Sequence, residues 1–353
     1  WTMRFDAFSS PITATSDNTN LIANPITVNP TSPATSGTLT FTPAANQAGT
    51  ATITVTVTDD GGTSGGGVNT TTRTFTVTVA PNQPPSFDLA RSWAPQPGAD
   101  GRVWQAVASS ADGQKLVAAE LGGRLHTSSD GGVTWTPRSS AGVGNWTAVA
   151  SSTDGLKLVA TRINGQIYTS TNAGGTWTAQ PGSGTRNWIS VASSADGTKL
   201  VATEFAVAYT GQIYTSTDSG VTWNLTSAVG NNWTAVASSA DGTRLAAVAT
   251  SPVFGGGLYL SANSGGAWTF SSSAGLLKWT AVASSTNGLK LLAAAEGAHL
   301  RTSADGGVTW VEQLGSLKTN WTSVASSADG SQLVAVAKGG FAYTSADSGV
   351  TWV

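Results

Sequence analysis

The chain of 353 residues is poor in charge: only 10% of its residues are charged, and the formal net charge is −2. It offers no basic surface to neutralise a phosphate backbone, which argues against nucleic acid as a partner. No apolar run approaches the roughly 20 residues that cross a bilayer, which argues against a membrane span. Cys is absent and Met occurs once, a balance that fits an exported or surface protein of a bacterium. The start at Trp1, without Met or a signal peptide, predicts a processed chain or a fragment.

Residues 1–85 show the alternation expected of strands with one buried face. In residues 50–58 and 72–79, β-branched or aromatic side chains alternate with Thr, which is the period-two pattern of a half-buried strand. Residues 21–28 and 38–42 are predicted as further short strands, at the spacing of a β-sandwich. We therefore expect a small β-sandwich domain over residues 1–85.

The phrase LTFTPAANQAGTATITVTVTDDGG (residues 39–62) resembles the bacterial immunoglobulin-like and cadherin-like repeats of surface proteins. The resemblance implies an immunoglobulin-like spacer, with the Pro-rich stretch at residues 81–86 as its linker. Asp59 and Asp60 allow two interpretations. They could contribute to a Ca²⁺ site, but Ca²⁺ takes six to eight oxygen ligands. Followed by two Gly residues, they also suit a hairpin turn, which is the interpretation we favour.

From residue 86 onward the sequence repeats a unit of about 42 residues. Each unit opens with Trp-X-X-Val-Ala-Ser-Ser and closes with a box of the form Ser-X-Asp/Asn-X-Gly-X-Thr/Ala-Trp. Repetition at this period indicates modules that bury their apolar faces against copies of themselves. The segments WTAVASS, LKLVAT, GQIYTS and GTWTAQ of the second unit predict four short antiparallel strands, as in a propeller blade. Six units are predicted over residues 86–353, starting near Trp104, Trp146, Trp188, Trp233, Trp279 and Trp321.

Two repeated turns take up most of the acidic residues. Tight hairpins favour Asp-Gly or Asn-Gly because these residues tolerate positive φ, and such pairs join the first two strands of every unit. In the boxes, an Asp or Asn oxygen can accept backbone N–H groups while the Trp packs beneath the turn. We therefore expect structural roles for the box carboxylates Asp130, Asp218, Asp305 and Asp347.

The boxes resemble the Asp-box, or BNR repeat, of sialidases, sortilin-type receptors, xyloglucanases and photosystem II assembly factors. This resemblance covers residues 93–353. It implies an all-β fold, a six-bladed Asp-box β-propeller preceded by the small immunoglobulin-like β-sandwich. Trp93 precedes Trp104 by 11 residues, the interval that also separates Trp135 from Trp146. We therefore expect residues 91–96 to pair with the last blade beside residues 351–353 and to close the ring.

The loops that join second to third strands are the expected place for a ligand, because they vary between units. The position at the end of the second strand carries residues of mixed charge from unit to unit. A functional interpretation makes these residues a polar ring around a central mouth, whereas the interpretation we favour treats them as solvated or mutually paired charges. The residues are Glu120, Arg162, Glu204, Thr250, Glu296 and Lys338.

The third and fourth units carry insertions on the same side. The distance between their two Trp residues is 35 residues, against 31 in the other units. The inserted loops contain Phe205, Tyr209 and Phe254, which could form an apolar wall on which a sugar or peptide stacks. Packing of one loop on the other explains them equally well.

The residues argue against an enzyme. Nine of the 11 Asp residues from Asp88 onward lie in the repeated turns, and no sialidase-type set of three Arg, a Tyr–Glu pair and an Asp is recognisable. His126 and His299 are expected on the solvent side of third strands, without the acidic or Cys cluster of a zinc site. No cofactor motif is present.

These observations predict a non-catalytic binding or scaffold module, extracellular or on a bacterial surface. Its partners would be glycans or other surface proteins, and strand addition between chains would also allow a multi-subunit assembly. Two alternatives remain open: a glycoside hydrolase of the Asp-box propeller type, and an assembly factor that resembles the photosystem II stability factor.

Overall fold

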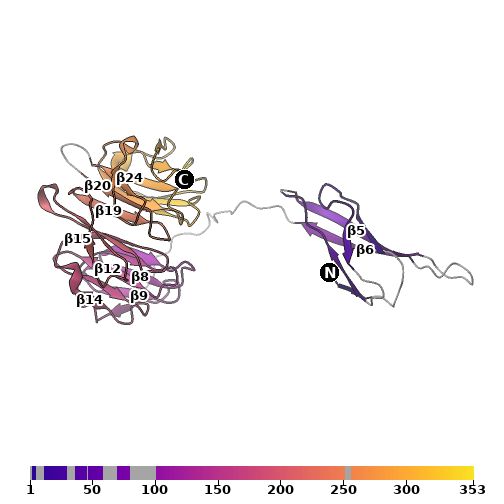
Figure 1. Cartoon of the computed structure of the whole chain (residues 1–353), viewed down its shortest axis with the longest axis horizontal. Coiled ribbons are helices and arrows are strands. Elements are labelled where there is room, and N and C mark those ends of the chain that lie inside the picture. Colours follow the sequence, from indigo (N-terminus) through magenta and orange to yellow (C-terminus); the bar gives the residue numbers. More distant parts are fainter. Residues whose placement is uncertain are drawn as a thin grey trace, which may run out of the picture. The chain divides into compact units, whose positions relative to one another are not determined.

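The computed structural model describes residues 2–4, 12–29, 36–45, 47–58, 70–79, 101–250 and 256–353. The chain divides into two compact parts, Trp1–Arg91 and Ser92–Val353 (Figure 1), which we call the N-terminal part and the repeat part. Several predicted features lie outside the described residues: the boundary after residue 85, the pairing of residues 91–96, and the side chains of Asp59, Asp60 and Phe254.

The N-terminal part contains two three-stranded antiparallel sheets around one core. Side chains of both sheets meet there, among them Leu39 from one sheet and Ile53 from the other, which is fully buried. The alternation of Thr with Ile or Val explains this, because only every second side chain of a strand reaches the core. The first sheet has the order β1 (Thr2–Arg4), β4 (Ser36–Thr40), β3 (Thr27–Asn29), and the second β2 (Ile12–Ser16), β5 (Gly49–Thr58), β6 (Thr70–Val79).

The two long strands were predicted correctly, but the strand predicted over residues 21–28 is mostly wrong. Only Thr27 and Val28 of that stretch belong to a strand. Leu21 and Ile22 are buried all the same, in a turn whose N–H groups are bonded to Asn18. Here the apolar pattern therefore identified residues of the core but did not identify a strand.

The described strands of the repeat part form six repeated antiparallel units, which we number 1 to 6 in chain order. Units 1 to 3 consist of β7 (Trp104–Ser109), β8 (Leu116–Gly123), β9 (Leu125–Ser128) and β10 (Thr136–Arg138); β11 (Gly144–Ser151), β12 (Leu158–Arg162), β13 (Ile167–Ser170) and β14 (Thr178–Gln180); and β15 (Trp188–Ser193), β16 (Leu200–Glu204), β17 (Ile213–Ser216) and β18 (Asn224–Leu225).

Units 4 to 6 follow the same order. They consist of β19 (Trp233–Ser238), β20 (Leu245–Ala249), β21 (Leu258–Ser261) and β22 (Thr269–Phe270); β23 (Trp279–Ser284), β24 (Leu291–Ala298), β25 (Arg301–Ser303) and β26 (Val311–Glu312); and β27 (Thr319–Ser326), β28 (Leu333–Ala337) and β29 (Ala342–Ser345). Three short 3₁₀ turns, η1 (Pro181–Ser183), η2 (Val207–Tyr209) and η3 (Ser272–Ala274), lie in the connections.

Consecutive units pack face to face, and we call each such contact a joint. In each joint the opening Trp of one unit enters the apolar face of the preceding unit, as Trp188 does against Val159 and Ile167. Burying one Trp removes up to about 200 Å² from water, worth roughly 5 kcal/mol as an upper bound. Five joints, from unit 1–unit 2 to unit 5–unit 6, have such a core among the described residues.

The first strands also meet around a common space. A cavity of about 350 Å³ is lined by the Ser-rich ends of the first strands of all six units. Backbone hydrogen bonds link these ends from unit to unit, for example Ala111 N to Thr153 O at 2.8 Å and Thr153 N to Ala195 O at 2.7 Å. The units therefore succeed one another around a central axis.

Candidate functional site

The repeated carboxylates hold turns, as predicted. In the box of unit 5, Asp305 Oδ1 accepts the Thr309 N–H at 2.9 Å and Asp305 Oδ2 accepts the Thr309 hydroxyl at 2.6 Å. These bonds, with one from Ser303, lower the pKa of Asp305 to about 2, because they favour the charged form. Asn172 accepts the Thr176 N–H in the same way in unit 2, so the turn needs the oxygen rather than the charge.

In three of the six units, the residue predicted to belong to the polar ring is not the one that lies opposite the opening Trp. Strand register places Glu120, Arg162 and Glu204 directly opposite the opening Trp of their units. In units 4 to 6 the residue opposite the Trp is an Ala, namely Ala249, Ala295 and Ala337. Thr250, Glu296 and Lys338 therefore come one residue later, where a side chain points to the other face of the strand.

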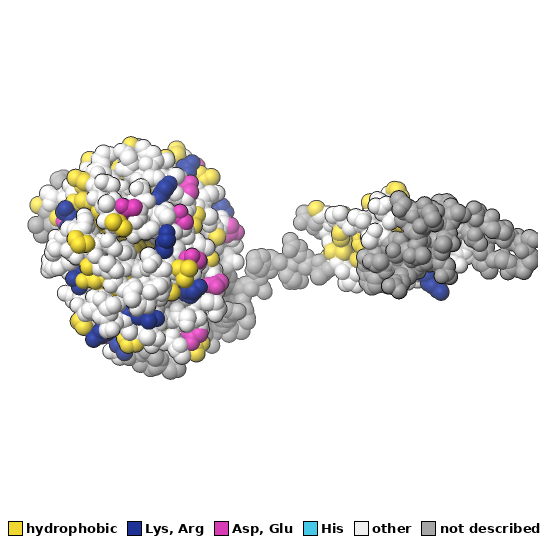
Figure 2. Space-filling view, turned by 60° about the horizontal axis from the view of Figure 1, so that its bottom comes forward, with side chains coloured by type: hydrophobic (Ala, Val, Ile, Leu, Met, Phe, Trp, Pro, Cys, Tyr) yellow, Lys and Arg dark blue, Asp and Glu magenta, His cyan; other side chains and the backbone are white. Residues whose placement is uncertain are grey.

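The carboxylates of this set pair with cations of their own unit. Glu120 Oε2 lies 3.2 Å from Arg102 Nη1, and Glu204 Oε2 lies 3.4 Å from Arg186 Nη1. Glu296 pairs with Lys278 at 3.8 Å, with both side chains half exposed. Figure 2 shows cationic and anionic side chains intermingled on the visible face of the repeat part. This is the arrangement of paired surface charges that we favoured.

The remaining cations of the ring differ from one another. Arg162 lies with its guanidinium carbon 5.5 Å from the ring centre of Trp146 and 4.8 Å from that of Tyr168, so it stacks on aromatic rings. Lys338 is exposed. Three of the six residues are thus engaged in ion pairs and one in ring stacking.

His126 corrects another prediction, because it is buried rather than on the solvent side. Only 2% of it is exposed, its Nε2 lies 3.1 Å from Glu120 Oε2, and its ring packs edge-on against Trp104. Burial lowers the pKa of His126, against the opposing effect of Glu120. It occupies the third-strand position that holds Tyr168 in unit 2. His299 is half-buried, and its Nδ1 lies 2.5 Å from Ser316 O.

The loop of unit 3 presents part of the predicted apolar wall. Phe205 is 38% exposed, and Tyr209 is half-buried at the end of η2 with a φ of +61°. Phe254, which was to complete the wall, lies outside the described residues.

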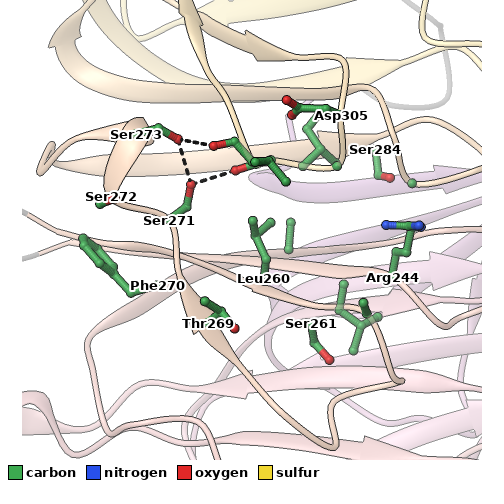
Figure 3. A pocket seen from close by; sticks show the side chains of 18 residues that line it. Arg244, Leu260, Ser261, Thr269, Phe270, Ser271, Ser272, Ser273, Ser284 and Asp305 are labelled. Carbon is green, nitrogen blue, oxygen red and sulfur yellow. Dashed lines mark hydrogen bonds between the residues drawn. The ribbon is translucent and has the colours of Figure 1, made fainter.

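A different site is formed at the joint between units 4 and 5, where a cavity of about 400 Å³ opens (Figure 3). Phe270 lies at one end and Arg244 at the other, with Leu260 between them. Ser271 and Ser273 donate hydrogen bonds to Gly307 O at 2.8 Å and Val308 O at 2.7 Å. Further hydroxyls in the lining belong to Ser261, Thr269, Ser272 and Ser284.

Two changes in the repeat open this cavity. In unit 2, Gln180 Nε2 donates to Thr169 Oγ1 at 2.6 Å across the sheet, and Gln313 donates likewise to Thr302 in unit 5. Unit 4 has Leu260 and Ser271 at the corresponding positions. The long side chain that covers this part of the sheet is replaced by Ser, so space is left. Comparison of the units at these two positions could have revealed the site from the sequence.

The electrostatics of the cavity come from one cation and one carboxylate. A Cβ built on Gly306 would lie 3.2 Å from Arg244 Nη1, which places the guanidinium against the box turn of unit 5. Asp305 is the one carboxylate in the described lining, and its oxygens are engaged in the turn. In the part of the chain that the structure describes, no group of three or more His, Cys, Asp or Glu could hold a metal ion.

Among the described residues, no helix is long and apolar enough to cross a membrane. No protein-family model and no curated protein matches the sequence.

Solved structures match the repeat part in fold. An ancestral GH74 enzyme gives a TM-score of 0.58 at 17% identity over 72% of this chain, which spans 38% of the enzyme's length. YCF48 from Cyanidioschyzon merolae gives 0.54 at 16% identity, over 73% of this chain and 86% of YCF48; YCF48 bound to D1 peptide gives 0.53 at 17%, over 71% and 81%. The β-propeller domain of Myceliophteria thermophila Cps50 (Swd1) gives 0.51 at 12%, over 66% and 80%.

These similarities define the class of the protein. The repeat part has a β-propeller fold, in an all-β chain whose only described helical segments are three short 3₁₀ turns. At such low identities the similarity extends to the fold alone, and the neighbours include an enzyme as well as YCF48 with a bound peptide.

Proposed function

We propose that the chain is a non-catalytic glycan-binding module whose site is the cavity between units 4 and 5. In this proposal the six units are Asp-box blades, the N-terminal part is an immunoglobulin-like spacer, and the protein acts outside a bacterial cell or on its surface. The observation that carries the proposal is a cavity rich in hydroxyls whose described lining holds a single carboxylate, already engaged in a turn.

The chemistry of the lining supports binding rather than bond cleavage. Glycoside hydrolysis needs two carboxyl groups on either side of the scissile bond, one of them protonated as the acid. Asp305 has a pKa of about 2 and is therefore ionised at neutral pH, so it cannot serve as that acid.

The same lining suits a sugar. The hydroxyls of Ser261, Ser271, Ser273 and Ser284 already donate within the protein, so they can accept hydrogen bonds from sugar hydroxyls. Arg244 adds a cation for a carboxylated or sulfated sugar. Phe270, which is 40% exposed, offers an aromatic face at the rim. A volume of about 400 Å³ falls within the range of small-molecule sites.

The similarity to YCF48 with its bound D1 peptide supports a second candidate, a peptide-binding scaffold. The exposed loop with Phe205 and Tyr209 would then be the contact surface. The similarity to a GH74 enzyme supports glycoside hydrolysis as a third candidate function. Hydrolysis would need a second carboxylate, and the described lining of the cavity has only Asp305.

The test begins with the full chain on a glycan array, followed by calorimetry with the best ligand. Leu260→Thr together with Ser271→Gln restores the residues that fill this space in units 2 and 5. We expect the double variant to fold as the wild type does and to lose binding at least tenfold. Phe270→Ala should weaken binding several-fold.

Phe205→Ala is the matched control, an aromatic side chain of similar exposure on the unit 3 loop, and it should bind as the wild type does. Loss of binding in Phe205→Ala with full binding in the double variant would move the site to the loop. Turnover of chromogenic glycosides by the purified chain would show that the protein is a hydrolase.

A further inference from the structure

A cation before the second strand of a unit reaches across the joint into the next unit. Lys157 Nζ lies 3.2 Å from the Ser219 hydroxyl in the joint between units 2 and 3, and Lys290 Nζ lies 3.4 Å from the Ser348 hydroxyl in the joint between units 5 and 6. In two further joints the Lys at this position donates to a backbone carbonyl of the next unit, at 3.0 and 2.9 Å. In four of the five joints, the protein itself therefore binds this cation.

The joint between units 4 and 5 differs at both ends of this contact. Arg244 replaces the Lys, and Gly306 stands where the boxes of units 3, 4 and 6 have a Ser. The stem of Arg244 lies against Gly288, since a Cβ on that glycine would be 2.7 Å from Arg244 Cβ and Cδ. A Cβ on Gly306 would be 3.2 Å from Arg244 Nη1. The guanidinium thus lies beside the place of the missing Ser side chain.

No group in the part of the chain that the structure describes binds this guanidinium. The backbone N–H of Arg244 donates to Ser239 Oγ at 3.0 Å, but none of its side-chain nitrogens has a hydrogen-bond or ion-pair partner among these residues. Asp305, the neighbour of Gly306, accepts hydrogen bonds from Ser303 and Thr309 instead. Because Arg244 is exposed, its five side-chain N–H donors are accessible to a ligand.

The space beside this cation is larger than at the same place in two other joints. The cavity lined by Lys157 and Ser219 measures about 10 Å³, and the one lined by Lys290 and Ser348 about 150 Å³, against about 400 Å³ beside Arg244. Figure 3 shows Arg244 at one end of the large cavity and Phe270 at the other. A ligand that fills this cavity therefore meets a cation at one end and an aromatic ring at the other.

We propose, resting on the glycan-binding function above, that the ligand is an acidic glycan whose carboxylate or sulfate binds the guanidinium of Arg244. A guanidinium presents its N–H groups as a planar fork that matches two oxygens of such a group. The Ser hydroxyls of the lining accept hydrogen bonds from the sugar. Gly306 determines the preference for acid, because a Ser at this position would bind the cation within the joint.

Glycans that differ only in charge test this assignment. Calorimetry compares the best acidic glycan of the array with its neutral counterpart, in which the carboxyl group is reduced to an alcohol or the sulfate is removed. The wild type should bind the acidic form at least about tenfold more tightly, the effect of hydrogen bonds to a charged group. Arg244→Gln, which introduces the residue of unit 6 at this position, should remove this preference and leave binding of the neutral form unchanged.

Gly306→Ser tests how the guanidinium is kept free. Ser219, Ser264 and Ser348 adopt φ values of +60°, +57° and +62° in their boxes, and Gly306 has a φ of +74°, so the turn accepts a Ser. This variant should keep the Tm of the wild type and bind the acidic form several-fold more weakly. Lys157→Gln is the matched control, because that cation is already bonded to Ser219, and it should leave binding unchanged.

A second measurement does not depend on finding the natural glycan. The full chain, isotope-labelled at the arginine nitrogens, is titrated with sodium glucuronate and separately with glucose, and its NMR signals are followed. The Arg244 Nε signal, assigned by its loss in Arg244→Gln, should shift with glucuronate alone.

The outcomes separate the acidic ligand from the glycan-binding function. Equal affinity for acidic and neutral glycans, with no effect of Arg244→Gln, would overturn the acidic ligand and leave the function. A shift of Arg244 with glucuronate but no glycan retained on the array would support the anion site and overturn the function. Absence of the shift with glucuronate would overturn the role of Arg244.

Discussion

Val149 and Val107 occupy the same position in consecutive units, yet one is 7% exposed and the other 66%. Val149 lies in the joint between units 1 and 2, whereas Val107 lies on the face that no described unit covers. The comparison shows that the repeated sequence determines which side chains a unit presents on its faces, but not whether another unit covers those faces. Identical side chains contribute to stability only where the next unit covers them.

The largest effect should come from removing a Trp from a closed joint. Trp177 is 5% exposed in the joint between units 1 and 2, and Trp135 is its half-buried counterpart at the open face. Trp177→Ala should lower the free energy of unfolding by about 3 to 5 kcal/mol, and Trp135→Ala by roughly half as much. Urea denaturation measures both, and equal losses would mean that the open face is covered.

Val→Ala substitutions compare the packed face with the open face through smaller losses of stability. Val149→Ala should destabilise by roughly 2 kcal/mol because it leaves a cavity in a packed joint. Val107→Ala should stay within about 0.5 kcal/mol of the wild type, as expected at an exposed position. A loss at Val107 similar to that at Val149 would contradict the account.

Two glycines isolate the contribution of packing from that of the backbone. Gly155 and Gly113 both have a φ of +69°, but a Cβ on Gly155 would lie 2.8 Å from Lys115 Cβ while one on Gly113 would have open space. The backbone strain of an Ala is therefore the same at both positions. Gly155→Ala should cost about 1 kcal/mol more than Gly113→Ala, measured by thermal or chemical unfolding. Equal losses of stability in the two variants would show that the side chain of Lys115 moves aside without an energetic penalty.

The smallest effect concerns the acid dependence of the box turns. Asp130, Asp305 and Asp347 have pKa values of about 2, against an ordinary value of 3.8, because hydrogen bonds hold their charged forms. Their contribution to stability is therefore full above about pH 4 and is lost as the pH falls towards 2. Replacing all three by Asn, the residue of the unit 2 box, should flatten the decline of Tm in this range. An unchanged decline would assign acid unfolding to other groups.

The sequence was sufficient for the features that repeat. Local patterns that recur in every unit predict the Trp positions, the turn chemistry of Asp305 and the strand order of each unit. The misalignment of the charged set was avoidable. Glu296 follows Trp279 by 17 residues, whereas Glu120 follows Trp104 by 16, and the residue opposite the opening Trp is the sixteenth after it in both units.

Burial of polar residues was the other limit. His126 was placed on the solvent side from its strand alone, but a neighbouring Trp104 and Glu120 enclose it. The cavity at Leu260 and Ser271 was likewise missed, since each residue is unremarkable by itself. Both depart from the residues of units 2 and 5 at the same place, opposite the box of unit 5, which a comparison of the units at these two positions would have shown.

Hydrogen exchange of the linking backbone amides tests the central claim most directly. The N–H groups of Ala111, Thr153, Ala195, Ala240 and Thr286 each donate to the next unit, so they should exchange slowly in the native protein. Ala328 N, at the corresponding place in unit 6, should exchange much faster in the isolated chain. Protection of Ala328 equal to that of the other five would contradict an open face between units 1 and 6.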